Sequence, residues 1–338
     1  MSIPRLIILI LLVATLERGF AGEPIRGVTI SAQTWGKEWQ TPEMADALDE
    51  LKSLGANSIA IHPYARIQTD GSLRFDETPE PSYVTKPLEW AHERGLGVML
   101  VPHIAYWGTP YLWRGEIDFP KASQWNRFFS DYKRWITGMA RIAEEHHAGV
   151  LCIGLEYTHA QKFEARWREM IREIRAVYHG KLTYGSNWGE TDDVHFWDAL
   201  DYIGVLAYFP LTNAANPAPE QLAEGWKPWM KKLESDSQHF GKPVLFTEIG
   251  YDESALCAAK PWSFHDSSGP NAAEIQARCI EQALKLPKEY PFLAGMYFWK
   301  WFPNLPCPEV ETFDLRKPSI KGLFSKYWLP VAGGTVQP

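Results

Sequence analysis

Short apolar runs alternate with longer amphipathic segments along almost the whole chain. The apolar runs lack the in–out alternation of a half-buried strand, which is typical of strands covered on both faces of a parallel sheet. We predict such strands at residues 27–32, 58–62, 97–103, 149–155, 182–186, 202–207, 244–247 and 294–299. The amphipathic segments predict helices at residues 42–54, 82–93, 122–147, 162–179, 194–200, 219–240, 272–286 and 319–327.

Eight strand–helix units in one chain predict an α/β fold, a (β/α)8 TIM barrel in a single domain. An open, doubly wound sheet is the alternative, but no glycine-rich phosphate loop follows any predicted strand. The longest loops follow the second, third, seventh and eighth strands, on the face where parallel barrels carry their active sites. Asp70-Gly71 predicts a small hairpin over residues 66–75 at this rim.

The first residues have the features of an export signal. Arg5 precedes an apolar run over residues 6–16, and Gly19 and Ala21 are the small residues of a cleavage site. We therefore predict a signal peptide at 1–21, a barrel at 22–338, and a secreted or periplasmic protein. The run is too short to span a bilayer, so no stable membrane insertion is expected after cleavage. An uncleaved anchor is the alternative.

Composition points to a carbohydrate partner. The formal net charge of −7 argues against nucleic acid, which selects for basic surfaces. Sixteen tryptophans are unusually many, and an indole is a flat partner for the apolar C–H face of a sugar ring. Half of them lie at or after predicted strand ends: Trp35, Trp39, Trp107, Trp113, Trp188, Trp262, Trp299 and Trp301.

Two glutamates follow buried strands. Glu156 ends the fourth predicted strand and Glu248 ends the seventh. A carboxylate is costly to bury inside such a strand, so both belong at the barrel mouth, where these two strands face one another. Paired carboxylates on two strands are the catalytic groups of a glycosidase.

Several motifs carry a family resemblance. Gly154-Leu155-Glu156 and Thr247-Glu248-Ile249-Gly250-Tyr251 are similar to strand ends of clan A glycoside hydrolases. With residues 102–104, 113–117, 297–301 and 313–318, the chain resembles glycoside hydrolase family 113. The resemblance implies a retaining, endo-β-1,4-mannanase-like enzyme that needs no cofactor or metal. It implies Glu156 as acid/base and Glu248 as nucleophile.

Further substrate-site residues follow from strand ends and from this resemblance. Tyr208 is expected to bond the nucleophile, Trp299 to lie under the cleaved sugar, and Trp113 and Trp301 to bind substrate. Many clan A enzymes have Asn before the acid/base to bind the sugar 2-hydroxyl, but here that residue is Leu155. Either Asn187 or His103 could take that role.

Two other functions stay open at this point. One is a polysaccharide-binding barrel without catalysis, and the other is a metal-dependent barrel hydrolase that uses His62 and His103. Among the four cysteines, we predict a disulfide between Cys257 and Cys307, in neighbouring rim loops, with Cys152 and Cys279 free. The exact glycan, its linkage and endo or exo action are not determined by these patterns.

Overall fold

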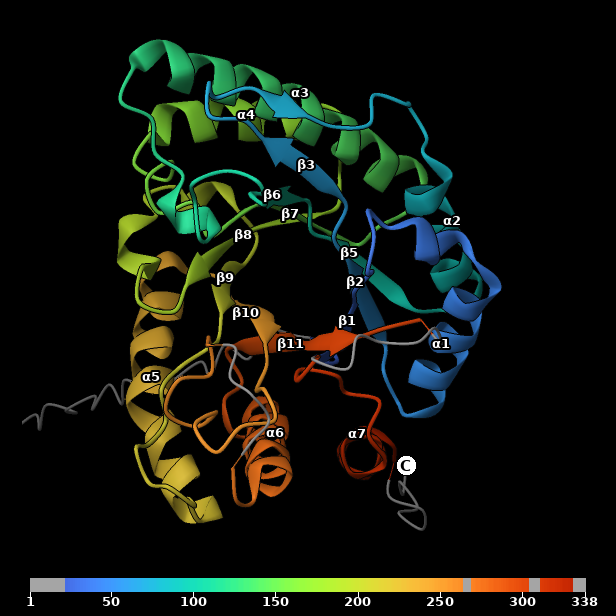
Figure 1. Ribbon diagram of the computed structural model, residues 1–338, viewed down its shortest axis with the longest axis vertical. Helices are drawn as coiled ribbons and strands as arrows, with labels where there is room; N and C mark the ends of the chain where they lie inside the picture. Colours follow the sequence, from blue (N-terminus) through green and yellow to red (C-terminus); the bar gives the residue numbers. More distant parts are fainter. Residues whose placement is uncertain (1–21, 264–268, 304–310, 331–338) are drawn as a thin grey trace, which may run out of the picture.

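The fold is a closed parallel barrel. The structure is a computed structural model that describes residues 22–263, 269–303 and 311–330, so the predicted signal peptide lies outside the described residues. Eight parallel strands close in the order β1-β11-β10-β9-β8-β7-β5-β2, which confirms the predicted (β/α)8 barrel (Figure 1). They are β1 (Ile25–Ile30), β2 (Ser58–Ile61), β5 (Gly97–Leu100), β7 (Val150–Leu155), β8 (Lys181–Asn187), β9 (Ile203–Leu206), β10 (Val244–Ile249) and β11 (Leu293–Trp301).

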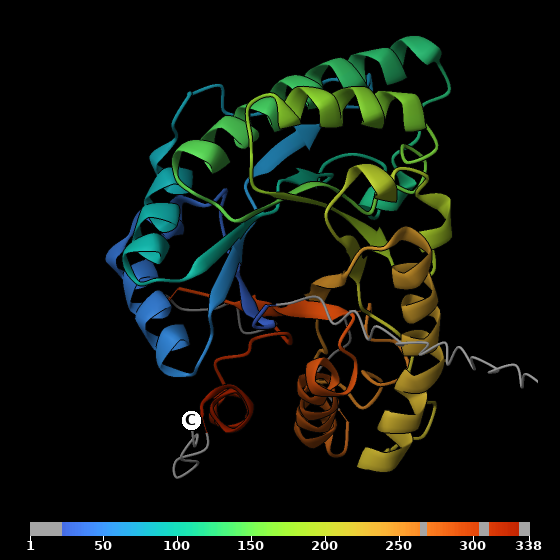
Figure 2. The same ribbon diagram turned by 180° about the vertical axis from the view of Figure 1, so that it is seen from behind.

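Helices form a ring outside the strands, seen from the far side in Figure 2. In the described ranges they are α1 (Pro42–Ser53), α2 (Ser82–Glu93), α3 (Ala122–Glu145), α4 (Glu164–Arg175), α5 (Pro219–Phe240), α6 (Ala272–Glu289) and α7 (Pro318–Trp328). The helix predicted at 194–200 is wrong, because that segment holds only a 3-10 turn at Trp197–Ala199. Phe196 stacks on Trp167, and Trp197 contacts Tyr184. Neighbouring residues of an α-helix point in different directions, so a helix would not bury both of these adjacent rings on one face.

Side chains alternate between two apolar layers. Along β7, Val150 and Cys152 join the cluster inside the barrel, and Leu151 and Ile153 join the larger cluster beneath the helices. This period of two is the geometry of a strand, and burial of both faces explains why the sequence reads as a continuous apolar run. The barrel is therefore a packed core, and an open site can form only at its mouth.

A small sheet stands beside the barrel and is called the side sheet here. Its strands are β3 (Tyr64–Ile67), β4 (Leu73–Arg74) and β6 (His103–Ala105). β3 and β4 are antiparallel, which confirms the predicted hairpin, and β3 also pairs in parallel with β6. Because β3 follows β2 and β6 follows β5 after only two residues each, the side sheet continues two barrel strands past the mouth. It lies against α3, where Asp131 accepts the backbone N–H of Leu73 (Figure 1).

Cys257 differs from prediction, whereas Cys152 and Cys279 are free thiols as predicted. Cys257 is a buried free thiol, and no disulfide at bonding distance is present among the described residues; Cys307 lies outside them. Cys257 instead lies beside Cys279 on α6, and burial, followed by a hydrogen bond with Cys257, raises the pKa of the Cys279 thiol. No helix in the described ranges is long and apolar enough to cross a membrane.

Candidate active site

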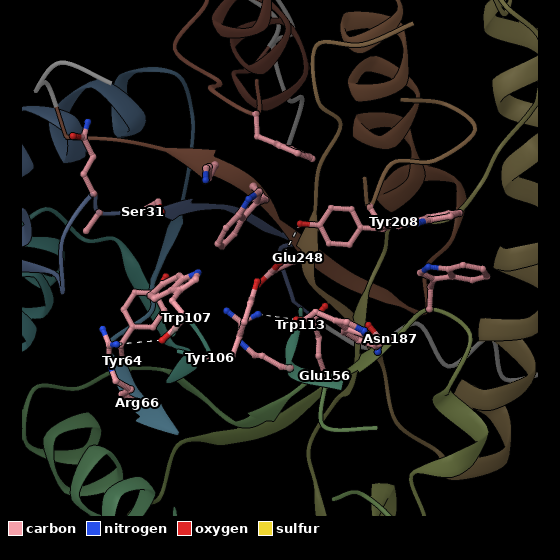
Figure 3. A pocket seen from close by; sticks show the side chains of 18 of the residues that line it. Ser31, Tyr64, Arg66, Tyr106, Trp107, Trp113, Glu156, Asn187, Tyr208 and Glu248 are labelled. Atoms are coloured by element: carbon pink, nitrogen blue, oxygen red, sulfur yellow. Dashed lines mark hydrogen bonds and ion pairs between the residues drawn. The ribbon is translucent and has the colours of Figure 1, made fainter. Parts of the chain in front are cut away.

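A cleft of about 1070 Å³ opens at the carboxyl ends of the barrel strands. Glu156 and Glu248 both line it, and Figure 3 shows them reaching toward one another from different strands. Tyr208 lies beside Glu248, while Tyr64, Arg66 and Trp107 gather on another side of the cleft (Figure 3). The barrel thus brings together two carboxylates that are 92 positions apart in the chain, Glu156 and Glu248.

Glu248 is nearly buried, with 6% of its surface exposed. It lies within β10, and the Tyr208 hydroxyl donates a hydrogen bond to Oε2 over 3.0 Å. Burial and then the nearby Glu156 raise the pKa of Glu248 to about 8, against the opposing effects of Arg114, Tyr208 and Lys300. Two close carboxylates in a dry site resist double ionisation, so this pair is suited to hold one proton between them.

Glu156 follows β7 directly and has a positive φ of 60°. Few residues other than glycine adopt this left-handed conformation, which costs about 1–2 kcal/mol. The backbone N–H of Glu156 donates to the Gly185 carbonyl over 2.9 Å, which anchors the turn to β8. The chain therefore leaves the strand at this residue and places the carboxylate at the barrel mouth.

Arg114 connects the two carboxylates and was missed as a site residue by the sequence reasoning. Its Nη1 donates to Glu156 Oε2 over 2.7 Å, its Nη2 to His103 Nδ1 over 3.0 Å, and its Nε to the Ile104 carbonyl over 2.9 Å. The side chain is only 13% exposed. The sequence marked the 113–117 segment through the family resemblance, but no pattern indicated that this arginine turns inward.

His103 is a neutral hydrogen-bonding group in this site. It is buried, and burial followed by the charge of Arg114 lowers the pKa of His103 well below its usual value. Its Nε2 lies 3.5 Å from Glu248 Oε1. Since a guanidinium only donates, Nδ1 of His103 must be the acceptor and Nε2 must carry the proton. That N–H is on the side of the ring nearest Glu248.

His62 stacks on His103 with ring centroids 4.7 Å apart, and its Nε2 lies 3.2 Å from the Ser31 hydroxyl. These are the two histidines of the predicted metal alternative. Across the described ranges, no three or more His, Cys, Asp or Glu side chains are grouped as metal ligands. In these ranges the two histidines meet, but they belong to no such group.

Six of the eight predicted rim tryptophans line the cleft: Trp35, Trp107, Trp113, Trp188, Trp262 and Trp299. Trp39 and Trp301 do not, because both are fully buried. The β1–β11 register shifts between Thr29, which pairs with Trp299, and Ile30, which pairs with Trp301. This irregularity breaks the period of two, so Trp301 does not share the orientation of Trp299. Trp301, unlike Trp299, therefore does not line this cleft.

Asn187, at the end of β8, also lines the cleft. Its buried Nδ2 has no hydrogen-bond partner within the described part of the chain. Leu155, by contrast, is fully buried in the cluster inside the barrel. Its position explains why an apolar residue is accommodated before Glu156.

Other cleft residues have no counterpart in the sequence predictions. Tyr64 and Arg66 come from β3, and Arg66 lies 4.8 Å over the Trp35 ring and donates to the Trp107 carbonyl over 3.2 Å. Lys300 of β11 pairs with Glu311 over 2.7 Å. Arg66 belongs to the hairpin predicted at residues 66–75 and Tyr64 lies just before it, but a hairpin pattern does not show which face meets the substrate.

Several proteins of known structure share this fold. The GH113 β-mannanase AaManA from Alicyclobacillus acidocaldarius, in complex with ManMIm, is 25% identical with a TM-score of 0.79, over 92% of this chain and 98% of that one. Another GH113 β-1,4-mannanase is 21% identical with a TM-score of 0.78, over 91% and 99% of the two chains. A family 5 mannosidase from Rhizomucor miehei shares the fold at 12% identity and a TM-score of 0.60, over 90% and 92% of the two chains.

No curated protein sequence matches the chain significantly. The profile of Glycoside Hydrolase Family 113, however, matches residues 28–312, from β1 to the segment before α7. This span includes both glutamates and the strands that carry them. The chain therefore belongs to glycoside hydrolase family 113.

Proposed function

We propose that the protein is a retaining glycoside hydrolase that cleaves β-1,4-mannan, with Glu248 as nucleophile and Glu156 as acid/base. The observation that carries this proposal is the pair of carboxylates in one aromatic cleft, with Glu248 held by Tyr208. Family membership supports glycoside hydrolysis, and the mannanase names of the similar structures support the choice of substrate.

In the first step, a Glu248 oxygen attacks the anomeric carbon while Glu156 gives its proton to the leaving oxygen, and the glycosidic bond breaks. A glycosyl ester of Glu248 forms. In the second step, Glu156 removes a proton from water, the water oxygen bonds to the anomeric carbon, and the ester bond to Glu248 breaks. Two inversions give net retention, which requires the two carboxyl groups to be about 5–5.5 Å apart.

The aromatic lining supports the substrate assignment. The indole rings that line the cleft offer flat apolar surfaces, and Trp299, whose ring lies 6.1 Å from that of His103, would support the reacting sugar. The unpaired Asn187 amide is a candidate donor or acceptor for the sugar 2-hydroxyl. With these roles, the proposal also specifies how the sugar is oriented in the cleft.

A polymer substrate also fits export. A polysaccharide is too large to enter a cell, so we extend the proposal to a secreted or periplasmic protein from which residues 1–21 are removed. Amino-terminal sequencing of the protein recovered outside the cytoplasm should begin at Gly22. A chain that keeps its first residues and stays with the membrane fraction would contradict this part.

The decisive experiment compares reducing-end release from mannan, glucomannan, xylan and cellulose, with product configuration followed by NMR. We expect mannan to be preferred and the β-anomer to form first. Glu248→Ala should abolish turnover, and Glu156→Ala should spare substrates with good leaving groups, which need little protonation. Glu169→Ala is the matched control and should stay active, because it removes only an exposed ion pair between Glu169 on α4 and Lys133 on α3. An α-anomer formed first, or full activity of Glu248→Ala, would refute the mechanism.

A further inference from the structure

Arg114 occupies a place that the two-carboxylate mechanism does not explain. It contacts the proposed acid/base directly and reaches the proposed nucleophile through His103. Its charge also acts on Glu248, since Arg114 lowers the pKa of that carboxyl. One guanidinium therefore serves both carboxylates from a single, nearly buried position.

The contact with Glu156 has opposite effects on the two steps. A paired guanidinium stabilises a carboxylate over the neutral acid. The first step needs Glu156 as an acid, and there the negative charge of the ionised Glu248 opposes the effect of Arg114. Once Glu248 is esterified, that negative charge is gone and Arg114 remains. When Glu156 must act as a base, the Arg114 guanidinium still donates to its carboxylate over 2.7 Å.

The contact with His103 serves Glu248. Because Arg114 donates to Nδ1, the neutral imidazole keeps its proton on Nε2, 3.5 Å from Glu248 Oε1. Tyr208 donates to the other oxygen, Oε2. Without Arg114 the ring could take its other tautomer and present a lone pair to Glu248, which would repel the carboxylate.

We propose that Arg114 is a positioning residue for both steps, supporting Glu156 as the base that activates water and holding the His103 Nε2 proton toward Glu248. The inference rests on the proposed function, since it concerns the roles of the same two carboxylates. Its main effect falls on the second step, where base catalysis is needed and no opposing charge remains.

Arg114→Met tests this idea, because methionine is similar in length and uncharged. With a 2,4-dinitrophenyl β-mannobioside, whose leaving group needs no protonation, we expect kcat to fall about 10–100-fold. We expect kcat/KM to fall much less, and a burst of dinitrophenol to precede the steady state. Azide needs no general base, so it should accelerate turnover and yield a mannosyl azide. Equal losses in kcat and kcat/KM, with no burst and no azide effect, would overturn the proposal.

Two further variants separate charge from bulk. Arg114→Lys keeps a positive charge and should retain a larger part of kcat than Arg114→Met, whereas equal losses would count against the charge argument. Arg66→Met removes another arginine from the same cleft, one that contacts Trp35 and the Trp107 carbonyl. It should change KM without a burst or an azide response; the same response as Arg114→Met would overturn the assignment.

A second measurement does not need activity, so it separates failure of this inference from failure of the proposed function. Thermal unfolding is compared for the wild type, Arg114→Met, Glu156→Gln and the double variant. If the ion pair couples the two residues, the loss of Tm caused by Arg114→Met should be at least halved in the Glu156→Gln background. Equal losses in both backgrounds would reject the coupling, even for a protein that cleaves no mannan.

Discussion

Replacing Tyr208 by Phe removes a hydroxyl that donates to the proposed nucleophile. The bond is 3.0 Å long, and its acceptor, Glu248, is 6% exposed, so little water can replace the lost donor. A hydrogen bond to a charged group is worth about 1.5–3 kcal/mol. At about 1.4 kcal/mol for each factor of ten, kcat/KM should fall roughly 10–150-fold near neutral pH.

The pH profile should move as well. The pKa of Glu248 is raised to about 8, and the Tyr208 hydrogen bond acts in the lowering direction. Attack requires Glu248 ionised and Glu156 protonated, so the acidic limb of kcat/KM reports the uptake of a second proton by the pair, on Glu248. Tyr208→Phe raises the pKa of Glu248 further, so this acidic limb should shift upward by about one to two pH units.

The assay measures kcat/KM on a soluble mannooligosaccharide from pH 5 to pH 10 at low substrate concentration. Tyr297→Phe is the matched control, because its buried hydroxyl bonds Ser58 over 2.9 Å inside the barrel and does not contact Glu248. That variant should be less stable with an unshifted profile. The reasoning fails if the acidic limb of Tyr208→Phe coincides with that of the wild type or moves to lower pH.

Three more predictions follow from the site. Glu248 binds its proton in the fold up to about pH 8 but in the unfolded chain only to about pH 4.5, so stability should fall as pH rises between these values. Glu248→Gln should then stabilise the protein by about 2–4 kcal/mol at pH 8 and little at pH 5, and equal Tm gains at both would disprove it. Trp299→Ala should lower kcat/KM at least tenfold with little change in Tm. Trp135→Ala should instead lose about 3–5 kcal/mol of stability and keep its kinetics. Unchanged kinetics in Trp299→Ala would refute the role of Trp299 as the surface under the reacting sugar. Asn187→Ala should lower kcat about tenfold on mannan but not on a 2-deoxy substrate, and equal losses on both would reject its 2-hydroxyl role.

The barrel was predictable because its strands bury both faces, which leaves an unmistakable apolar run around residues such as Leu151 and Phe246. The two glutamates were conspicuous for the same reason, since each interrupts or follows such a run. The orientation of Trp301 was not predictable, because it depends on a register shift between β1 and β11 rather than on residue type.

Arg114 shows another limit of sequence reasoning. An arginine in a polar loop is ordinarily solvated, and only the fold reveals that this loop directs its guanidinium between His103 and Glu156. The helix prediction at residues 194–200 failed for a related reason, because burial of the adjacent rings of Phe196 and Trp197 overrides a short helical pattern. Tertiary contacts decide both cases.

The side sheet has a consequence for how affinity and specificity can change in this protein. One wall of the cleft, with Tyr64 and Arg66, stands on β3, whose backbone is already ordered by pairing with β4 and β6. Ligand binding at this wall costs little backbone conformational entropy, because the strand is ordered beforehand. A preorganised surface therefore selects the sugar that binds there. The wall with Trp188 and Trp262 lies on loops, where insertions are tolerated more readily. Divergence in chain-length preference among relatives should therefore concentrate on the loop wall, while the strand-borne wall keeps a constant shape.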